Sequence, residues 1–171
     1  MSTNAVTPRL VPCVACGGLF AGGKGPTHRY MESSPGCWAA YGEVLAREYG
    51  DGAYRRLHRL TVDAYAVQHP GGSSPQAVQS VAVHLMSLCV VLERGARCED
   101  ATRLIGMAAG RKGSYPRIEP PSTRGAITVA DVRSAASADA HLECVRKWAE
   151  AAWLAWQPHH DRVREWINQL T

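Results

Sequence analysis

Residues 74–95 read SPQAVQSVAVHLMSLCVVLERG, and this stretch decides the fold class. Ser74 followed by Pro75 is typical of the first residues of a helix, and Gly95 is typical of the residue after its end. Between them, apolar side chains occupy nearly every face, which indicates a helix surrounded by other elements. We therefore predict that this helix lies at the centre of the core.

Apolar residues at three- and four-residue spacing predict further helices on both sides of this stretch. They cover residues 37–49, 51–69, 99–109, 128–157 and 159–170. Residues 110–126 carry four basic side chains, three prolines and no period, and predict a long loop, which could be a binding loop or plain connection. No segment alternates apolar and polar residues, so the expected fold class is all-α, a helical bundle. We expect residues 1–36 to form an irregular N-terminal zinc-knuckle arm and residues 37–171 the bundle, in one compact domain overall.

Composition excludes several classes of protein. The chain has 171 residues, 46% of them hydrophobic, and a net charge of +4 that is spread along its length. This small, dispersed excess disfavours nucleic acid as a partner. The N-terminus lacks the apolar run of a signal peptide, and no stretch is long enough and free enough of polar residues to indicate a membrane span. We expect a soluble, cytoplasmic protein whose partner is an unknown small molecule or protein.

Two cysteines three residues apart, Cys13 and Cys16, lie in a glycine-rich stretch with no helical or strand period. Cysteines at this spacing can direct both sulfurs to one metal ion, and the glycines after Cys16 permit the tight turn this needs. No second Cys-x-x-Cys follows, and the nearest further ligands are His28 and Cys37. We predict a structural zinc site of Cys13, Cys16, His28 and Cys37, with His28 the least secure ligand.

Two other interpretations of these thiols stay open. A redox pair of Cys13 and Cys16 would need the first sulfur at a helix N-terminus in a strand–helix unit, which the sequence does not indicate. The thiols could also carry no ligand. Of the remaining cysteines, Cys89 and Cys144 fit helical apolar faces and are expected in the core, whereas Cys98 has no assignment.

Polar residues on two neighbouring helices form a second candidate site. The short turn at residues 70–74 folds the helix of residues 74–95 back against the preceding one, which brings His84 level with His58 and Asp63. If these three converge, Asp63 is a base or ligand and the histidines are ligands or proton carriers. His69 and His84 are candidates for a second metal. A buried hydrogen-bond network that fixes the helix register, or an ordinary ion pair of Asp63, would explain the same residues without catalysis.

Four sequence elements resemble an uncharacterised family of small bacterial proteins. They are Cys13-Val14-Ala15-Cys16-Gly17, Pro35-Gly36-Cys37-Trp38, the run from Asp63 to Gly71 that reads DAYAVQHPG, and the run from Gln79 to Leu85 that reads QSVAVHL. The resemblance spans about residues 13–95, and it implies no activity. Two hypotheses follow for function: a zinc-binding protein with a His/Asp pocket suited to hydrolysis or group transfer, or a non-enzymatic, zinc-stabilised interaction module. The sequence leaves open whether the protein is an enzyme, and it leaves open the oligomeric state.

Overall fold

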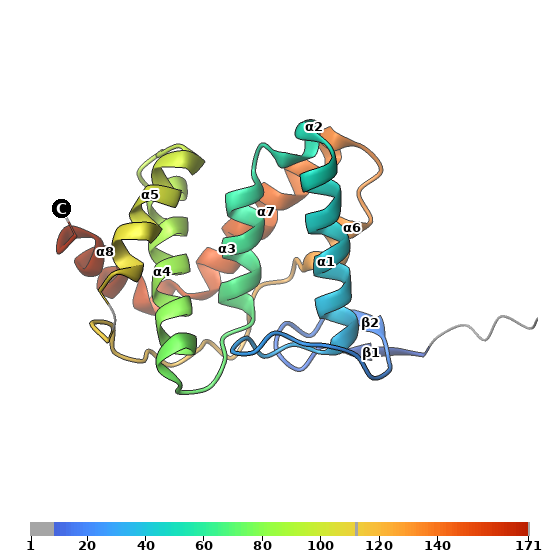
Figure 1. Cartoon of the computed structure of the whole chain (residues 1–171), viewed down its shortest axis with the longest axis horizontal. Coiled ribbons are helices and arrows are strands. Elements are labelled where there is room, and N and C mark those ends of the chain that lie inside the picture. Colours follow the sequence, from blue (N-terminus) through green and yellow to red (C-terminus); the bar gives the residue numbers. More distant parts are fainter. Residues whose placement is uncertain (1–8, 112, 171) are drawn as a thin grey trace, which may run out of the picture.

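The computed structural model describes residues 9–111 and 113–170. Figure 1 shows a mostly helical fold, as predicted, with one small hairpin at the foot of α1. In chain order the elements are β1 (Leu10–Pro12), β2 (Leu19–Ala21), α1 (Pro35–Gly50), α2 (Gly52–Arg55), α3 (His58–Gln68), α4 (Pro75–Leu92), α5 (Cys98–Ala109), α6 (Val129–Arg133), α7 (Ala138–Ala155), the 3₁₀-helix η1 (Gln157–His159) and α8 (His160–Asn168).

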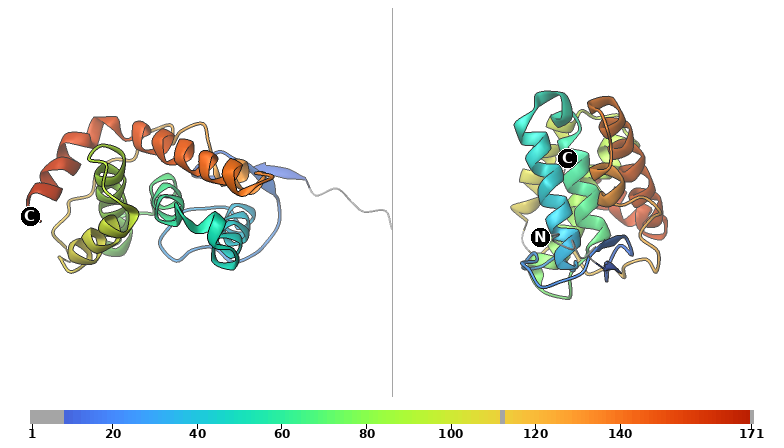
Figure 2. Two further views of the ribbon diagram at one scale, coloured as in Figure 1. Left: turned by 90° about the horizontal axis from the view of Figure 1, so that it is seen from above. Right: turned by 90° about the vertical axis from the view of Figure 1, so that its right-hand side faces the viewer.

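The helices form a row that is crossed by a second layer. Helices α1, α3 and α4 run side by side, with α5 packed on α4, whereas α7 and α8 run across one side of this row (Figures 1 and 2). Helix α4 contacts α3, α5, α7 and α8, which confirms its predicted central place. By length and composition, α4 could cross a membrane, but 56% of it is buried inside the bundle. It therefore has the features of the core helix of a soluble protein.

Short polar side chains begin most of the helices, because they satisfy amide groups that have no partner within the helix. The Oγ atoms of Ser34, Ser74 and Ser137 accept hydrogen bonds from amides in the first turns of α1, α4 and α7. Thr128 and Asp131 form a capping box at the start of α6. The predicted starts at residues 37, 74 and 128 lie within two residues of those of α1, α4 and α6, whereas the start of α7 after Ser137 is not among the predicted ones.

Two helices predicted as continuous are each broken in two. The segment 51–69 forms α2 and α3 with a break at Arg56 and Leu57, where neither glycine nor proline marks the interruption. The segment 128–157 forms α6 and α7. The Arg47 guanidinium, from α1, donates hydrogen bonds to the carbonyl oxygens of Val132, Arg133 and Ala135 and so ends α6. Arg47 lies more than 80 positions away in the sequence, but the Ser137 cap of α7 is a local signal of the same break.

The N-terminal arm is more regular than predicted. Strands β1 and β2 pair antiparallel, with Val11 opposite Phe20. Phe20 is buried, and Gly36 lies so close to the Ala21 carbonyl that a side chain there would overlap it. The hairpin therefore packs on the first turn of α1. With three residues in each strand, the alternation that identifies a strand is too short to detect.

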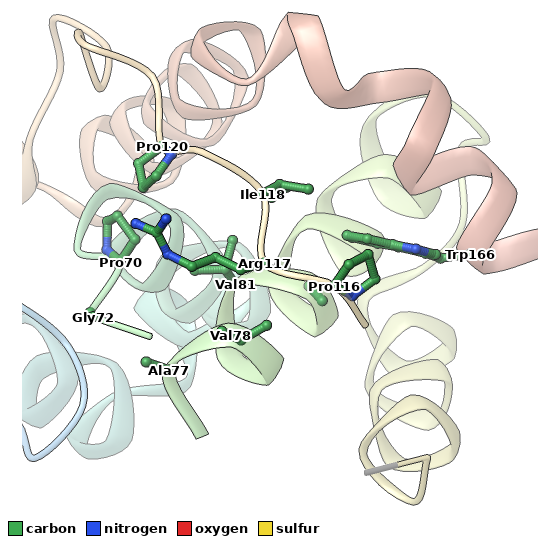
Figure 3. A pocket seen from close by; sticks show the side chains of 12 residues that line it. Pro70, Gly72, Ala77, Val78, Val81, Pro116, Arg117, Ile118, Pro120 and Trp166 are labelled. Atoms are coloured by element: carbon green, nitrogen blue, oxygen red, sulfur yellow. The ribbon is translucent and has the colours of Figure 1, made fainter. Parts of the chain in front are cut away.

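The predicted loop before α6 lies against the bundle. Pro116, Ile118 and Pro120 face Val81 and Trp166 across a cavity of about 10 Å³, which has room for about one water molecule (Figure 3). Its arginines are also engaged: Arg111 bonds to the Gln169 carbonyl, Arg117 pairs with Glu119, and Arg124 bonds to the Gln68 carbonyl. The bonds of Arg111 and Arg124 fasten the loop to the bundle, whereas the pair of Arg117 and Glu119 lies within the loop.

Candidate metal centre

Three cysteines and one histidine meet where the hairpin, α1 and α3 come together. Cys13 and Cys16 lie in the turn between β1 and β2, Cys37 in the first turn of α1, and His69 at the C-terminal end of α3. One ligand atom from each of the four side chains lies within 4.8 Å of all the others, and the group is buried except for the half-buried Cys16. Such a group could hold a metal ion.

The backbone of the hairpin turn directs the first two sulfurs. The Cys13 amide donates to the Gly18 carbonyl at 2.8 Å, and the Gly17 amide donates to the Cys13 carbonyl at 3.0 Å. Gly17 has a φ of 73°, a conformation that glycine adopts without strain. The Ser34 amide, just before α1, lies 3.4 Å from the Cys13 sulfur. An amide that points at a sulfur favours the thiolate form, which is the metal ligand.

His69 is oriented by the helix that carries it. Its Nδ1 lies 2.7 Å from the Tyr65 carbonyl oxygen, so Nδ1 carries the proton and the Nε2 lone pair is free. That Nε2 lies 3.3 Å from the Cys37 sulfur. The Tyr65 ring stacks on the imidazole at a centroid distance of 3.9 Å, and its hydroxyl lies 3.6 Å from the same sulfur. Metal-binding histidines are commonly fixed by such a hydrogen bond from the second ring nitrogen.

The electrostatics of the three thiols show that they do not ionise independently. Hydrogen bonds from Cys16 and then Cys37 lower the pKa of Cys13, although burial opposes its ionisation. The same interaction with Cys13 raises the pKa of Cys16 to about 11, and interactions with Cys13 and Cys16 raise the pKa of Cys37 as well. Without a cation, the group therefore favours one shared thiolate. Three thiolates in this space require a positive ion to balance them.

The histidine in this group is not the one that the spacing suggested. His28 lies outside the group: its ring contacts Tyr30 and Trp38, and its Nδ1 accepts a bond from the Tyr30 amide at 3.3 Å. His69 takes its place, 32 residues after Cys37. The sequence did contain a sign of this position, because the helix predicted for residues 51–69 ends at His69. Pro70, Gly71 and Gly72 follow it and indicate a turn. Gly71 lies against the Tyr30 carbonyl, and Met31 pairs with Pro70, so this turn lies against the arm.

Asp63 and His84 meet as predicted, but in a closed network. Asp63 is fully buried, and its carboxylate lies 2.7 Å from Nδ1 of His84 and 2.8 Å from the Arg59 guanidinium. The Ser87 hydroxyl donates to its second oxygen. All these donors come from α3 and α4, so the carboxylate joins the two helices. This arrangement matches the alternative in which the polar residues fix the register.

His58 does not join that pair. Its Nδ1 lies 2.6 Å from Oε2 of Glu48, a fully buried carboxylate on α1. His141 Nε2 and the Thr61 hydroxyl bond to Oε1 of the same carboxylate at 2.9 and 2.6 Å. Burial opposes ionisation of Glu48, but the bonds from His141, His58 and Thr61 outweigh it and lower the pKa of Glu48. Sequence reasoning missed Glu48, although its position four residues after the buried Val44 places a charge on the core face of α1.

The proposed second metal pair is separated as well. His69 belongs to the thiol group and His84 to Asp63. Within residues 9–111 and 113–170, the Cys13, Cys16, Cys37 and His69 group is the one set of three or more metal-ligating side chains that lie this close together.

Of the two cysteines expected in the core, Cys89 is buried and Cys144 is half-buried. Cys98, which had no assignment, is half-buried as well.

Comparisons with known proteins identify a family whose function is unknown. Residues 11–157 match the model of a family of unknown function, DUF5946. This range contains all four members of the thiol group. No curated protein and no solved structure matches the chain.

Proposed function

Since the chain belongs to the DUF5946 family, whose function is unknown, we propose from its geometry that it is a zinc-binding helical protein in which the metal is structural. The observation that carries the proposal is the Cys13, Cys16, Cys37 and His69 group, with one ligand atom of each within 4.8 Å of the others. Three thiolates and one imidazole are a donor set that suits zinc, and four protein ligands complete its tetrahedral coordination. A site of this kind leaves no position for a reacting water.

The chemistry of the site supports stabilisation of the arm. The four ligands come from the hairpin turn, the start of α1 and the end of α3, so a single ion would tie three separate segments together. Zinc would supply the positive charge that allows all three thiols to ionise. The protonated Nδ1 of His69, which is held by the Tyr65 carbonyl, leaves the Nε2 lone pair for the metal.

Metal analysis of single variants tests the ligand set. We expect one zinc per chain in the purified protein, measured by plasma mass spectrometry, and loss of that zinc in His69→Ala. His28→Ala is the matched control, because His28 also lies beside the arm but outside the group, and it should keep the full zinc content. Zinc lost from His28→Ala and kept in His69→Ala would overturn the assignment of the fourth ligand.

The redox alternative gives a different result in the same preparation. If Cys13 and Cys16 were an exchanging pair, mass spectrometry under mild oxidation would show a reversible disulfide between them in protein that holds no zinc. We expect these thiols to react with an alkylating reagent only after a chelator has removed the zinc. Zinc-free protein with a reversible Cys13–Cys16 disulfide would exclude the structural metal.

We propose that the Asp63 and His84 pair has a structural rather than a hydrolytic role. Arg59, His84 and Ser87 already occupy the Asp63 carboxylate, which favours the non-enzymatic hypothesis for this part of the molecule.

A further inference from the structure

A chain of hydrogen bonds leads from the buried carboxylate of Glu48 to the surface. Glu48 Oε2 lies 2.6 Å from Nδ1 of His58, and Nε2 of His58 lies 3.1 Å from the Tyr49 hydroxyl. Exposure rises along this chain: the side chain of Glu48 is 0% exposed and that of His58 is 22% exposed. Tyr49 is 60% exposed. The phenol oxygen is therefore the end of the chain that an external molecule can reach.

The hydrogen-bond pattern fixes which nitrogen of His58 carries the proton. Nδ1 faces an ionised carboxylate, so it is the donor, and in the neutral ring Nε2 keeps its lone pair. The Tyr49 hydroxyl then donates to Nε2. A buried carboxylate, an imidazole and a hydroxyl in this order are the arrangement in which a histidine activates a nucleophilic oxygen.

Glu48 is held firmly enough to orient the histidine. Thr61 from α3 and His141 from α7 bond to its other oxygen at 2.6 and 2.9 Å. The carboxylate is thus fixed by three donors on two helices, and His58 cannot turn without breaking its bond. Glu48 is a positioning residue in this arrangement, since it contacts the histidine and not the surface.

A cation beside Tyr49 indicates the kind of electrophile. The guanidinium carbon of Arg55 lies 5.2 Å from the centroid of the Tyr49 ring. Within the part of the chain that the structure describes, no carboxylate pairs with Arg55. Arginine binds phosphoryl oxygens well, and a positive charge here stabilises the negative charge that develops on them during transfer.

We propose that Tyr49 is a modification site that accepts a phosphoryl group, with His58 as the general base. In this step the Tyr49 oxygen attacks phosphorus and a P–O bond forms, while Nε2 of His58 takes the phenol proton. The donor is a phosphoric anhydride or phosphate ester: its P–O bond to the leaving oxygen breaks, and that oxygen departs with the bonding electron pair as a phosphate or alkoxide anion. Arg55 binds a phosphoryl oxygen throughout. A network that served only to hold helices together would not need an exposed phenol at its end.

A fluorophosphonate probe tests the site directly, because it transfers a phosphonyl group, a close analogue of the phosphoryl group, with fluoride as the leaving group. The full chain is treated with fluorophosphonate-biotin, and labelled residues are located and quantified by peptide mass spectrometry. Tyr30 is the internal control: it is also exposed, and the His28 imidazole beside it contacts its ring and its amide and not its hydroxyl. We expect labelling of Tyr49 at least about tenfold faster than labelling of Tyr30, because a general base contributes at least this much.

Variants separate the activated phenol from an accessible one. Tyr49→Phe should abolish the main label. His58→Gln should reduce Tyr49 labelling to the rate of Tyr30, and Arg55→Gln should slow it several-fold, while circular dichroism verifies that each variant is folded. Equal labelling of Tyr49 and Tyr30 in the unmodified protein would overturn the proposal even if His58→Gln failed to fold. A second zinc per chain that is lost in His58→Gln would also overturn it, since a metal would then hold the imidazole.

Discussion

Glu48 and Asp63 are two carboxylates with no exposed surface, and each joins its own helix to others. An ionised carboxylate in a core is costly unless several donors bond to it. Glu48 has donors on α3 and α7, and Asp63 has donors on α3 and α4. At the scale of the residue, these two side chains therefore act as crosslinks. Asp63 could be predicted to meet His84 because a short turn joins their helices, but nothing local brings Glu48 to His141.

Glu48→Gln should reduce stability at pH 7 by about 2 kcal/mol, because the neutral amide replaces charge-assisted bonds and leaves one donor without an acceptor. The folded state lowers the pKa of Glu48 from its usual 4.5. Its contribution is therefore complete above pH 4.5 and is lost as the pH falls through the lower, folded pKa. Urea unfolding between pH 7 and pH 3.5 should show that the difference in free energy of unfolding between the unmodified protein and the variant becomes smaller in acid. A difference that stays constant over this pH range would contradict this role of Glu48.

At the scale of the element, one amide side chain anchors the long loop. Gln68, at the end of α3, donates to the carbonyl oxygens of Arg124 and Ile127 at 2.7 and 2.8 Å, and its own oxygen accepts from the Trp148 indole at 2.7 Å. The loop is thus tied to α3 and α7 by one buried group. The sequence predicts that a loop exists there, since prolines and the lack of period are local, but it does not show what fastens the loop.

Gln68→Ala should destabilise the protein by about 3 kcal/mol, because it leaves two carbonyl groups and one indole N–H without partners. The loop should also become more accessible, and trypsin should cleave faster after Arg117 and Arg124. Gln79→Ala is the matched control, since Gln79 makes a single bond of this kind, to the Ala109 carbonyl. It should cost about 1 kcal/mol and leave cleavage of the loop unchanged. Equal cleavage of both variants would show that Gln68 does not anchor the loop.

At the scale of the whole molecule, the thiol group is where the arm meets the bundle. Helices α1 and α3 run in opposite directions, so the start of α1 and the end of α3 lie at the same end of the molecule (Figure 1). The hairpin adds Cys13 and Cys16 at this end. The arm itself has a small apolar core, and we expect it to depend on the metal far more than the helices do.

Removal of zinc by a chelator should therefore loosen the arm first. We expect the thermal midpoint to fall by about 5 °C or more, while most of the helical circular dichroism signal remains at room temperature. Limited trypsin digestion should then cut after Lys24 and Arg29 before it cuts the helices. A Cys98→Ser variant, altered outside the group, should respond to the chelator as the unmodified protein does. Loss of the whole helical signal at the same chelator concentration would show that the metal supports the bundle as well.

The sequence by itself determined the helical class, the central place of α4, the starts of α1, α4 and α6 and three of the four members of the thiol group. These features depend on neighbours within a few residues: an apolar period, a serine or threonine cap, two cysteines three residues apart. The tertiary structure alone decided that His69 and not His28 completes the group, and that His58 joins Glu48 and not Asp63. Each of these depends on which distant helix ends and faces pack together, and spacing along the chain does not contain that information.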